Sequence, residues 1–353
     1  MSLVIHPHFH RRYTGVSRHV ENVVPELARE LETRIIGSHL GSSMPRIRWG
    51  ELLGRIRREP VVWHAHRNNE LLVGVLLRLL GRQVKLVFTR HTARAPTAYT
   101  RWLARSADAL VALTNEVAEA MAMPSTIVGH GVDLGRFQPP VDRDEAWRKL
   151  GFGGRYGVGV VGRIRKEKGQ GDFIEAIRPL LPVYPEWRAV LVGLAKGPDK
   201  QWVDSLSDGL GERLVLAGEQ SVIQPWYQGF TLLVHPSYVE GYSLVHVEAM
   251  ASGCCVVASR LKYLDTLIEH GRTGFFFEPG DVKGLRELLD MLMREPERAR
   301  EVGRNAAEHA RTRCGIEHEA HALRDLYLSL LRESGSGSGQ HRLAEGSTAG
   351  EHR

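Results

Sequence analysis

The sequence predicts an α/β protein made of two Rossmann-like domains. Apolar runs typical of buried parallel strands alternate with helical patterns along most of the chain. At 353 residues, the chain is too long for one ordinary core and suits two domains. Pro139 and Pro140 provide a natural hinge between them.

These features divide the chain into four expected segments. They are an N-terminal domain (1–138), a C-terminal domain (139–315), a final helix (316–333) and a tail (334–353). The tail is rich in Gly, Ser and charge and has almost no apolar residues, so we expect it to be disordered.

The bulk composition is typical of a soluble globular protein. No apolar run is long enough to span a bilayer, and the N-terminus lacks the pattern of a secretion signal. The three cysteines, two of them adjacent at Cys254 and Cys255, match neither a disulfide framework nor a zinc spacing. We therefore expect a cytoplasmic protein.

The positive charge is concentrated in the first part of the chain. Residues 1–137 hold 19 Lys and Arg against 11 Asp and Glu, a net +8, whereas the remainder holds 28 against 30, a net −2. No zinc-finger or RNP pattern supports nucleic-acid binding, so a membrane surface or a phosphorylated acceptor fits better. The basic segment Arg46–Arg58 either lies on an anionic membrane or packs its apolar side on the sheet.

The most informative stretch runs from Leu232 to Ser259. An apolar strand leads into a short polar loop, and a helix is expected to begin near Leu244 and to stop at Gly253. Two carboxylates, Glu240 in the loop and Glu248 inside the helix, flank the free N–H groups of the helix N-terminus. An anion held between two acids that accept sugar hydroxyls describes a nucleotide-sugar site.

Residues 240–259, EGYSLVHVEAMASGCCVVAS, resemble the E-x7-E block of retaining glycosyltransferases in the GT4 family, which has the two-domain GT-B fold. The usual sequence of that block is EGFGLxxxEAMAxGxPVVAS. Ser243 and Cys255 depart from it, but both carboxylates are kept. The resemblance implies that Glu240 binds the sugar hydroxyls and Glu248 the ribose hydroxyls.

The same resemblance implies a set of donor-binding groups. Ser243, Leu244 and Val245 would bind the donor phosphates at the helix N-terminus. Two glycines after strands, Gly162 and Gly218, would line the donor, with the Gly218 turn reading the base through backbone groups.

A second block, GRIRKEKG at residues 162–169, resembles the family's GRLxxxKG block. Arg163 and Lys168 follow a strand and precede a helix. Two fixed cations there can neutralise the charge that develops on a departing diphosphate. The alternative is a charged turn without function.

The N-terminal half supplies candidates for the acceptor side. The opening HPHFHRRYTGV resembles bacterial lipopolysaccharide-core mannosyltransferases within GT4, and places Gly15 near the donor phosphates and Arg11 and Arg12 toward the acceptor. An ordinary solvated loop is the alternative for the two arginines. Arg90 and His91 follow a strong strand, and the resemblance makes His91 a residue near the transferred sugar.

Three patterns invite other interpretations. His64 and His66 could ligate a metal, but no third ligand stands at a convincing spacing. The D-x-D at residues 142–144 is better explained as a helix N-cap than as a Mn²⁺ site. The G-x-G-x-x-G at residues 157–162 has its first two glycines inside a strand, which disfavours dinucleotide binding.

The expected function is therefore a retaining, metal-independent glycosyltransferase without a cofactor. It would move a hexose, with mannose from GDP-mannose as the specific expectation, onto an anionic lipopolysaccharide-core or lipid-linked acceptor. It would work in the cytoplasm or at the inner face of the cytoplasmic membrane. A non-hydrolysing nucleotide-sugar epimerase and a non-catalytic nucleotide-sugar-binding partner remain as alternatives.

Overall fold

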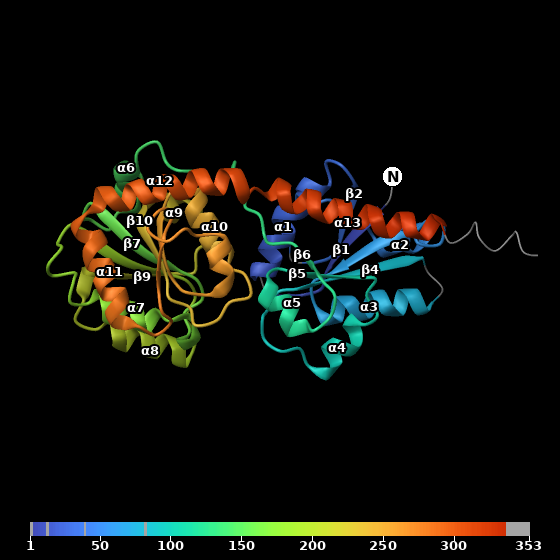
Figure 1. Ribbon diagram of the computed structural model, residues 1–353, viewed down its shortest axis with the longest axis horizontal. Helices are drawn as coiled ribbons and strands as arrows, with labels where there is room; N and C mark the ends of the chain where they lie inside the picture. The colour runs from blue at the N-terminus through green and yellow to red at the C-terminus, as the bar shows by residue number, and fades with distance from the viewer. Residues whose placement is uncertain (1–2, 12–13, 39, 81–82, 337–353) are drawn as a thin grey trace, which may run out of the picture. The chain divides into compact units, whose positions relative to one another are not determined.

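The computed structural model describes residues 3–11, 14–38, 40–80 and 83–336, which form two compact units (Figure 1). The N-terminal unit comprises residues 1–113, 117–128 and 319–353, and the C-terminal unit comprises residues 114–116 and 129–318. The division falls at Gly129, ahead of the proline pair that the sequence suggested. The reason is that Val132 hydrogen-bonds to both Cys314 and Ile316 and so joins the second unit.

The N-terminal unit is built on a six-stranded parallel sheet in the order β2-β1-β3-β4-β5-β6. Its strands are β1 (Leu3–His8), β2 (Glu32–Gly37), β3 (Val61–Ala65), β4 (Val84–Arg90), β5 (Ala109–Ala112) and β6 (Thr126–Ile127). Its helices are α1 (Gly15–Leu27), α2 (Trp49–Arg55), α3 (Asn68–Leu79), α4 (Ala98–Ala104), α5 (Asn115–Met121) and α13 (Ile316–Ser336), of which α5 and α13 begin in residues of the other unit.

Strand β1 includes the first residues of the HPHFHRRYTGV block. It continues through His8 and places His6 in the interior. Pro7 is tolerated because β1 pairs with β3 only over Leu3–Ile5, so its missing N–H breaks no ladder there.

The basic segment at residues 46–58 is a surface helix and its flanks. Ile47, Leu52 and Ile56 are buried in the core of the N-terminal unit, whereas Arg55 bonds to the carboxylates of Glu32 and Glu59. The apolar side of this segment therefore packs on the sheet, which was one of the two expected arrangements.

The C-terminal unit contains a second parallel sheet in the order β12-β11-β10-β7-β8-β9. Its strands are β7 (Tyr156–Val161), β8 (Trp187–Val192), β9 (Leu214–Gly218), β10 (Phe230–His235), β11 (Cys255–Ser259) and β12 (Phe275–Phe277). Its helices are α6 (Arg143–Leu150), α7 (Gln170–Ile177), α8 (Pro198–Ser207), α9 (Gln224–Gly229), α10 (Leu244–Ala251), α11 (Val282–Arg294) and α12 (Pro296–Arg313), with short 3₁₀ turns at Lys166–Lys168, Gly211–Arg213 and Lys262–Thr266.

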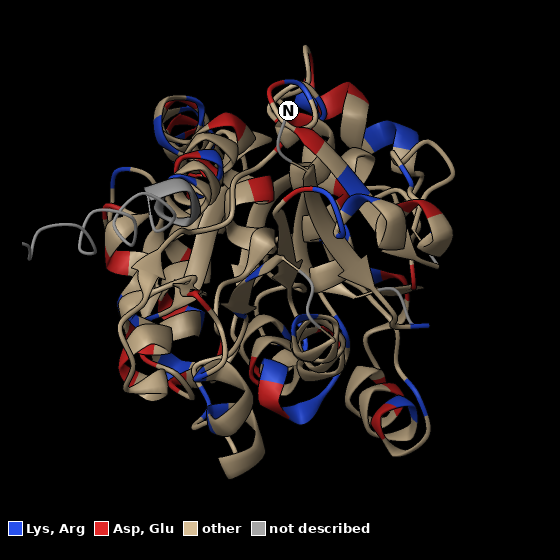
Figure 2. Cartoon of the chain, turned by 90° about the vertical axis from the view of Figure 1, so that its right-hand side faces the viewer, with Lys and Arg blue, Asp and Glu red and all other residues tan. Residues whose placement is uncertain are grey.

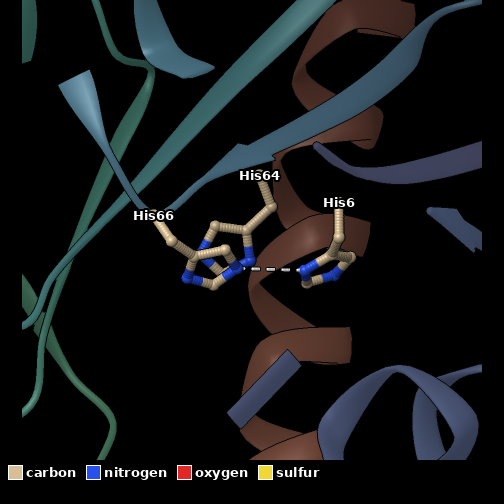
Figure 3. Close-up of side chains that lie close together, drawn as sticks. All are labelled: His6, His64 and His66. Carbon is tan, nitrogen blue, oxygen red and sulfur yellow. Dashed lines mark hydrogen bonds between the residues drawn. The ribbon is translucent and has the colours of Figure 1, made fainter. Parts of the chain in front are cut away.

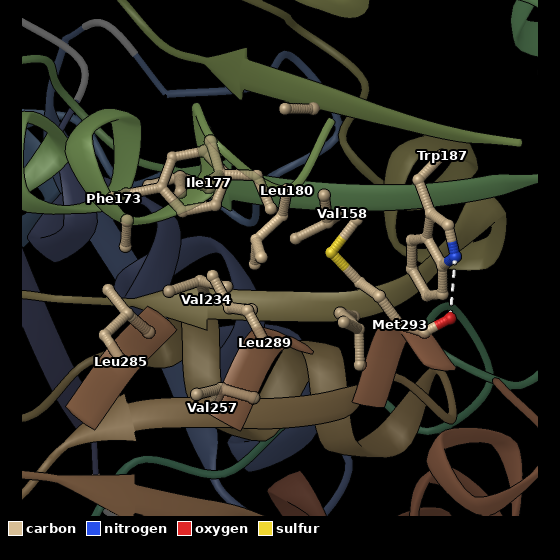
Figure 4. Close-up of a cluster of buried hydrophobic side chains, with 14 of the residues drawn as sticks. Val158, Phe173, Ile177, Leu180, Trp187, Val234, Val257, Leu285, Leu289 and Met293 are labelled. Carbon is tan, nitrogen blue, oxygen red and sulfur yellow. Dashed lines mark hydrogen bonds between the residues drawn. The ribbon is translucent and has the colours of Figure 1, made fainter. Parts of the chain in front are cut away.

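Each face of this second sheet carries its own hydrophobic core. Helices α7, α8 and α11 cover one face, where Phe173, Trp187 and Leu289 pack together (Figure 4). Helices α6, α9 and α10 cover the other, with Trp147 and Phe230 among the buried side chains. Because both faces of the sheet are covered by helices, side chains on both sides of each strand are buried, and the strand sequences are continuous apolar runs.

Two glycines inside β7 are explained by packing. A Cβ on Gly157 would lie 2.3 Å from the Trp147 ring, and one on Gly159 would lie 2.2 Å from the Phe230 ring. The prediction that these two glycines lie inside a strand is confirmed. Their role is to accept aromatic rings against the sheet.

Two other sequence predictions meet different outcomes. Asp142 caps α6, as expected, because its carboxylate accepts hydrogen bonds from the backbone N–H groups of Asp144 and Glu145. The disordered tail was expected to start at residue 334, but residues 334–336 complete the last turn of α13. The rest of the expected tail, 337–353, lies outside the described residues.

The charged side chains lie mainly on helices and loops, and the central strands carry few of them (Figure 2). Among the described helices, none combines the length and apolar character needed to cross a membrane. Glu70, in the first turn of α3, is an exception to the surface location of charge. It is buried, and burial raises its pKa to about 7 although its carboxylate accepts the His66 backbone N–H at 2.9 Å.

The Gly157→Ala variant is expected to be destabilised by about 1–3 kcal/mol, because the added methyl collides with the Trp147 ring. Gly54→Ala is the matched control, since its Cβ would meet open space on α2. That control is expected to be neutral or to gain up to about 1 kcal/mol. Urea unfolding of both variants measures the difference, and equal stabilities would contradict the packing role of Gly157.

Glu70 should make the protein less stable as pH rises from about 4.5 to about 7. Its pKa is 4.5 in the unfolded chain and about 7 in the folded protein. Its contribution to the free energy of unfolding is therefore complete below pH 4.5 and is lost as the pH rises through about 7. The loss amounts to about 3 kcal/mol. Glu70→Gln keeps an acceptor for the His66 N–H but cannot ionise. Between these two pH values, its free energy of unfolding should therefore not show the decrease with pH that the wild type shows.

Candidate active site

In the C-terminal unit, two loops at the carboxyl end of the sheet lie side by side. One follows β7 and contains Lys168, and the other follows β10 and contains Glu240. Because β7 and β10 are neighbouring parallel strands, their ends meet at one edge. The Lys168 Nζ donates to Glu240 Oε1 at 2.5 Å. A cation and a carboxylate 72 positions apart in sequence therefore share one site.

Gly169 makes this close approach of the loops feasible. A Cβ at this position would lie 2.0 Å from the carbonyl oxygen of Pro236, and the residue has φ +69°. The loops are also joined by hydrogen bonds from the Tyr238 N–H to the Glu167 carbonyl oxygen and from the Tyr238 hydroxyl to Asp172. The Lys-Gly pair of the sequence block thus places the Lys168 ammonium next to the glycine that lets the two loops approach.

The surroundings of Glu240 keep it ionised. Burial by itself would raise its pKa, but the hydrogen bond and charge of His235 and the ammonium of Lys168 outweigh burial and hold the pKa far below its ordinary value. His235 Nε2 lies 3.0 Å from the same carboxylate oxygen. At neutral pH, Glu240 is therefore a hydrogen-bond acceptor and not a proton donor.

Sequence reasoning missed two further polar residues at this site, His246 and Tyr263. The His246 ring is perpendicular to that of His235, with centroids 4.3 Å apart, and its Nδ1 lies 3.2 Å from the Tyr263 hydroxyl. Burial, followed by the charge of His235, lowers the pKa of His246 well below its usual value. The position of His246 between the two glutamates of the block was the available signal, whereas nothing in the sequence singled out Tyr263.

Helix α10 begins at Leu244, as predicted, with Ser243 as its N-cap. The Tyr263 hydroxyl accepts a hydrogen bond from the Ser243 N–H at 3.3 Å. The first turn of α10, which includes Val245, contains no acidic residue, so its N-terminal partial positive charge is not neutralised from within the helix. This end of α10 can bind an anion.

The two glutamates of the block have different environments. Glu240 lies in the loop beside Lys168, whereas Glu248 is fully buried on α10 and accepts a hydrogen bond from the Tyr227 hydroxyl at 3.0 Å. The role of Glu248 in ribose binding stays a prediction.

Arg163 does not join the contact between Lys168 and Glu240. Its side chain is exposed and makes no hydrogen bond or ion pair with the described residues. Gly162 follows β7 and Gly218 ends β9, the two strands on either side of β8. The Gly162 N–H donates to the Val192 carbonyl oxygen, and the Gly218 carbonyl oxygen accepts from the Gly193 N–H. The structure thus gathers Gly162, Gly218, Lys168 and Glu240 at the carboxyl end of one sheet.

In the N-terminal unit, the buried side chains of His6 on β1, His64 on β3 and His66 just after β3 lie close together (Figure 3). His6 Nδ1 lies 3.1 Å from His66 Nε2, and one ring nitrogen each from His6, His64 and His66 lie within 4.8 Å of one another. The sequence offered no third ligand for the His64/His66 pair at a convincing spacing, because His6 lies on the separate strand β1. These three residues could hold a metal ion.

The same rings are already engaged in hydrogen bonds. His64 is 2.5 Å from the Tyr327 hydroxyl and 2.6 Å from that of Thr89, and His66 Nδ1 is 3.2 Å from His91 Nε2. Burial lowers the pKa of both His64 and His66 well below the usual value, so these imidazoles are neutral. The candidate residue His91 thus sits at one end of a buried polar network.

The predicted acceptor-side residues Arg11, Arg12 and Arg90 lie in two segments. Arg11 is exposed and Arg12 lies outside the described residues. Gly15, which was predicted to lie near the donor phosphates, begins α1. Arg90 ends β4 and donates to the Arg94 carbonyl oxygen at 2.7 Å, and burial lowers its pKa.

Known proteins resemble this chain along most of its length. Residues 142–309 match the model of the family described as glycosyl transferases group 1. The chain is 37% identical, over 94% of its length and 98% of the relative, to the lipopolysaccharide core biosynthesis mannosyltransferase LpcC of Rhizobium leguminosarum bv. viciae. It is 34% identical, over 93% of its length and 98% of the relative, to the corresponding mannosyltransferase LpsB of Rhizobium meliloti.

Solved structures match the fold. The Anabaena Alr3699/HepE structure in complex with UDP covers 93% of this chain and all of that one, with a TM-score of 0.79 and 20% identity. Sucrose-phosphate synthase from Thermosynechococcus elongatus covers 94% of this chain and all of that one, with a TM-score of 0.76 and 18% identity. The expected GT-B fold is confirmed, and the chain belongs to the group 1 glycosyl transferases.

Proposed function

We propose that this glycosyltransferase moves a mannose residue from GDP-mannose onto a lipopolysaccharide-core acceptor, with retention of anomeric configuration and without a metal ion. The observation that carries the proposal is the contact between Lys168 and Glu240 beside the N-terminus of α10. The names of the two Rhizobium relatives support the sugar and the acceptor.

The charges at the site suit a nucleotide diphosphate. Lys168 and the amides at Leu244 and Val245 supply positive charge at one sheet edge, and the exposed Arg163 can turn toward the same anion. Fixed positive groups stabilise the negative charge that develops on a leaving diphosphate. They can do so without Mn²⁺, which is why we propose metal independence.

Glu240 suits the sugar. As an ionised, largely buried carboxylate it can accept hydrogen bonds from sugar hydroxyls, and its contacts with His235 and Lys168 fix its direction. Glu248 is proposed to bind the ribose hydroxyls.

The proposed reaction requires no protein nucleophile. The acceptor hydroxyl oxygen forms a bond to the anomeric carbon while the bond from that carbon to the β-phosphate oxygen breaks. The departing phosphate oxygen, on the same face of the sugar, takes the acceptor proton. The products are the glycoside and GDP, and His91 is proposed to help position the sugar.

Product analysis tests the proposal directly. Purified protein with GDP-mannose and a lipopolysaccharide-core acceptor should give a mannosylated acceptor whose new linkage keeps the α configuration of the donor, with undiminished turnover in EDTA. An epimerised donor would instead indicate the epimerase alternative, and an unchanged donor a binding partner. Activity with UDP-glucose but not GDP-mannose would overturn the donor assignment.

Removing the cations should slow turnover. Lys168→Ala is expected to lower kcat by on the order of 100-fold or more, the scale of losing one preorganised contact to a developing charge. Arg163→Ala should have a comparable effect. Arg304→Ala, an exposed arginine on α12, is the control and should leave kcat unchanged. Near-normal turnover in both site variants would refute their role.

Glu240→Ala should abolish transfer while GDP binding stays nearly intact, because Glu240 is proposed to contact the sugar and not the nucleotide. Calorimetric titration with GDP, beside the transfer assay, separates the two effects. Glu240→Gln, which keeps the size of the side chain, should also lose transfer. Loss of GDP binding in both variants would reverse the roles assigned to Glu240 and Glu248.

A further inference from the structure

The buried histidines His6, His64 and His66, here called the histidine cluster, come from two neighbouring strands of the N-terminal unit. Strand β1 pairs with β3 in parallel, and the register sets Ile5 beside Trp63. The next residues on the two strands are His6 and His64, and their ring centroids are 4.9 Å apart. His66 follows His64 by two positions, and side chains two residues apart on an extended chain point to the same side of a sheet. Strand pairing thus brings three imidazoles to one place.

The ring nitrogens of the histidine cluster are close enough to share one metal ion. His6 Nδ1 lies 3.1 Å from His66 Nε2, and Figure 3 shows these two rings meeting through their nitrogen atoms. Two imidazole nitrogens bound to one tetrahedral Zn²⁺ at about 2.0–2.1 Å are about 3.3–3.4 Å apart. One nitrogen from each of the three rings lies within 4.8 Å of the others, so a point exists within about 2.8 Å of all three. Shifts of less than about 1 Å would bring each nitrogen to the zinc-bond length.

The three rings are in the protonation state that a metal ion requires. A metal ion binds the lone pair of a neutral imidazole and competes with a proton for it. Burial lowers the pKa of His6 to about 3 and lowers the pKa values of His64 and His66 well below the usual value. At neutral pH, no proton therefore competes for these nitrogens, and neutral imidazoles are ligands that suit Zn²⁺.

The second nitrogen of each ring also has a partner. Metal-bound histidines commonly form a hydrogen bond through the ring nitrogen that does not touch the ion, and this bond fixes the ring. His66 Nδ1 lies 3.2 Å from a ring nitrogen of the next histidine in the network, and His6 Nε2 lies 3.5 Å from the Tyr327 hydroxyl. His64 contacts the hydroxyls of both Tyr327 and Thr89. One of these two contacts can hold the His64 ring while the other gives way to the ion.

We propose that the histidine cluster binds one Zn²⁺ ion and that this ion fastens α13 to the sheet of the N-terminal unit. Tyr327 of α13 contacts ring nitrogens of His64 and His6, which are 263 and 321 positions away in sequence. An ion that fixes these imidazoles therefore also fixes the surface that holds the Tyr327 hydroxyl. The inference goes beyond the proposed function and gives the ion a structural role, since the groups proposed to bind the diphosphate belong to the C-terminal unit.

Elemental analysis tests the site without donor or acceptor. Protein produced without a polyhistidine tag in zinc-supplemented medium and washed with EDTA should contain about one zinc ion per chain. The ion should survive the wash because His6 and His64 are fully buried. His66→Gln keeps a polar side chain but removes an imidazole ligand, and should retain less than about a tenth of the zinc. His318→Ala removes an exposed histidine and should keep the zinc content of the wild type.

Metal uptake by the wild type tests the site even if His66→Gln folds poorly. Protein stripped of metal by a chelator in mild urea and then refolded should melt roughly 5 °C or more higher once Zn²⁺ is added. Mg²⁺, which prefers oxygen ligands, should leave the melting temperature unchanged. Tyr327→Phe removes only the hydroxyl that orients the rings, and should weaken zinc binding by about 10–100-fold.

Two results would overturn the proposal. One is a wild type that holds no zinc and whose melting temperature Zn²⁺ does not change, which would leave a hydrogen-bonded network as the only link among the rings. The other is a His66→Gln variant that holds as much zinc as His318→Ala, which would place the metal elsewhere. Zinc content measured beside the transfer assay in EDTA separates this inference from the proposed function. Retained zinc with lost transfer defeats only the reaction, and absent zinc with undiminished transfer defeats only the metal site.

Discussion

The ion pair between Lys168 and Glu240 is the interaction on which the C-terminal site depends. It joins two loops that are far apart in sequence, and it lies in a partly buried place where unpaired charges would be costly. Each partner provides the opposite charge that the other needs at this depth. In the proposed reaction, the Lys168 ammonium contacts the diphosphate and the Glu240 carboxylate accepts hydrogen bonds from the sugar hydroxyls.

The sheet makes this pair geometrically accessible. In a parallel sheet, every strand delivers the following loop to the same edge, so the neighbours β7 and β10 bring their loops together. Helix α10 starts immediately after the second loop and adds its N-terminal amides to the same place. The short approach also requires a residue without a side chain at Gly169, since any Cβ would collide with Pro236.

The two units differ in the kind of polar group that they bury. The C-terminal unit keeps a carboxylate ionised through the neighbouring His235 and Lys168. The N-terminal unit buries histidines that stay neutral because desolvation lowers their pKa values, and it links them through Tyr327 of α13. The first arrangement suits binding of charged or hydroxyl-bearing groups, whereas the second is a hydrogen-bonded network beneath His91.

The sequence alone determined the α/β class, the two sheets and the location of α10, because buried parallel strands are continuous apolar runs and the glutamate block has distinctive spacing. It also explained Asp142 as a cap, which depends only on local backbone geometry. Tertiary structure alone decided which groups meet. Local patterns carry no information on strand order, so the arrival of Tyr263 and the third histidine from β1 could not be predicted. That Lys168 lies near Glu240 followed only from the family resemblance, and the direct ion pair between them came from the structure. The different environments of the two glutamates have the same cause, since burial of Glu248 against Tyr227 depends on how α10 packs on its neighbours.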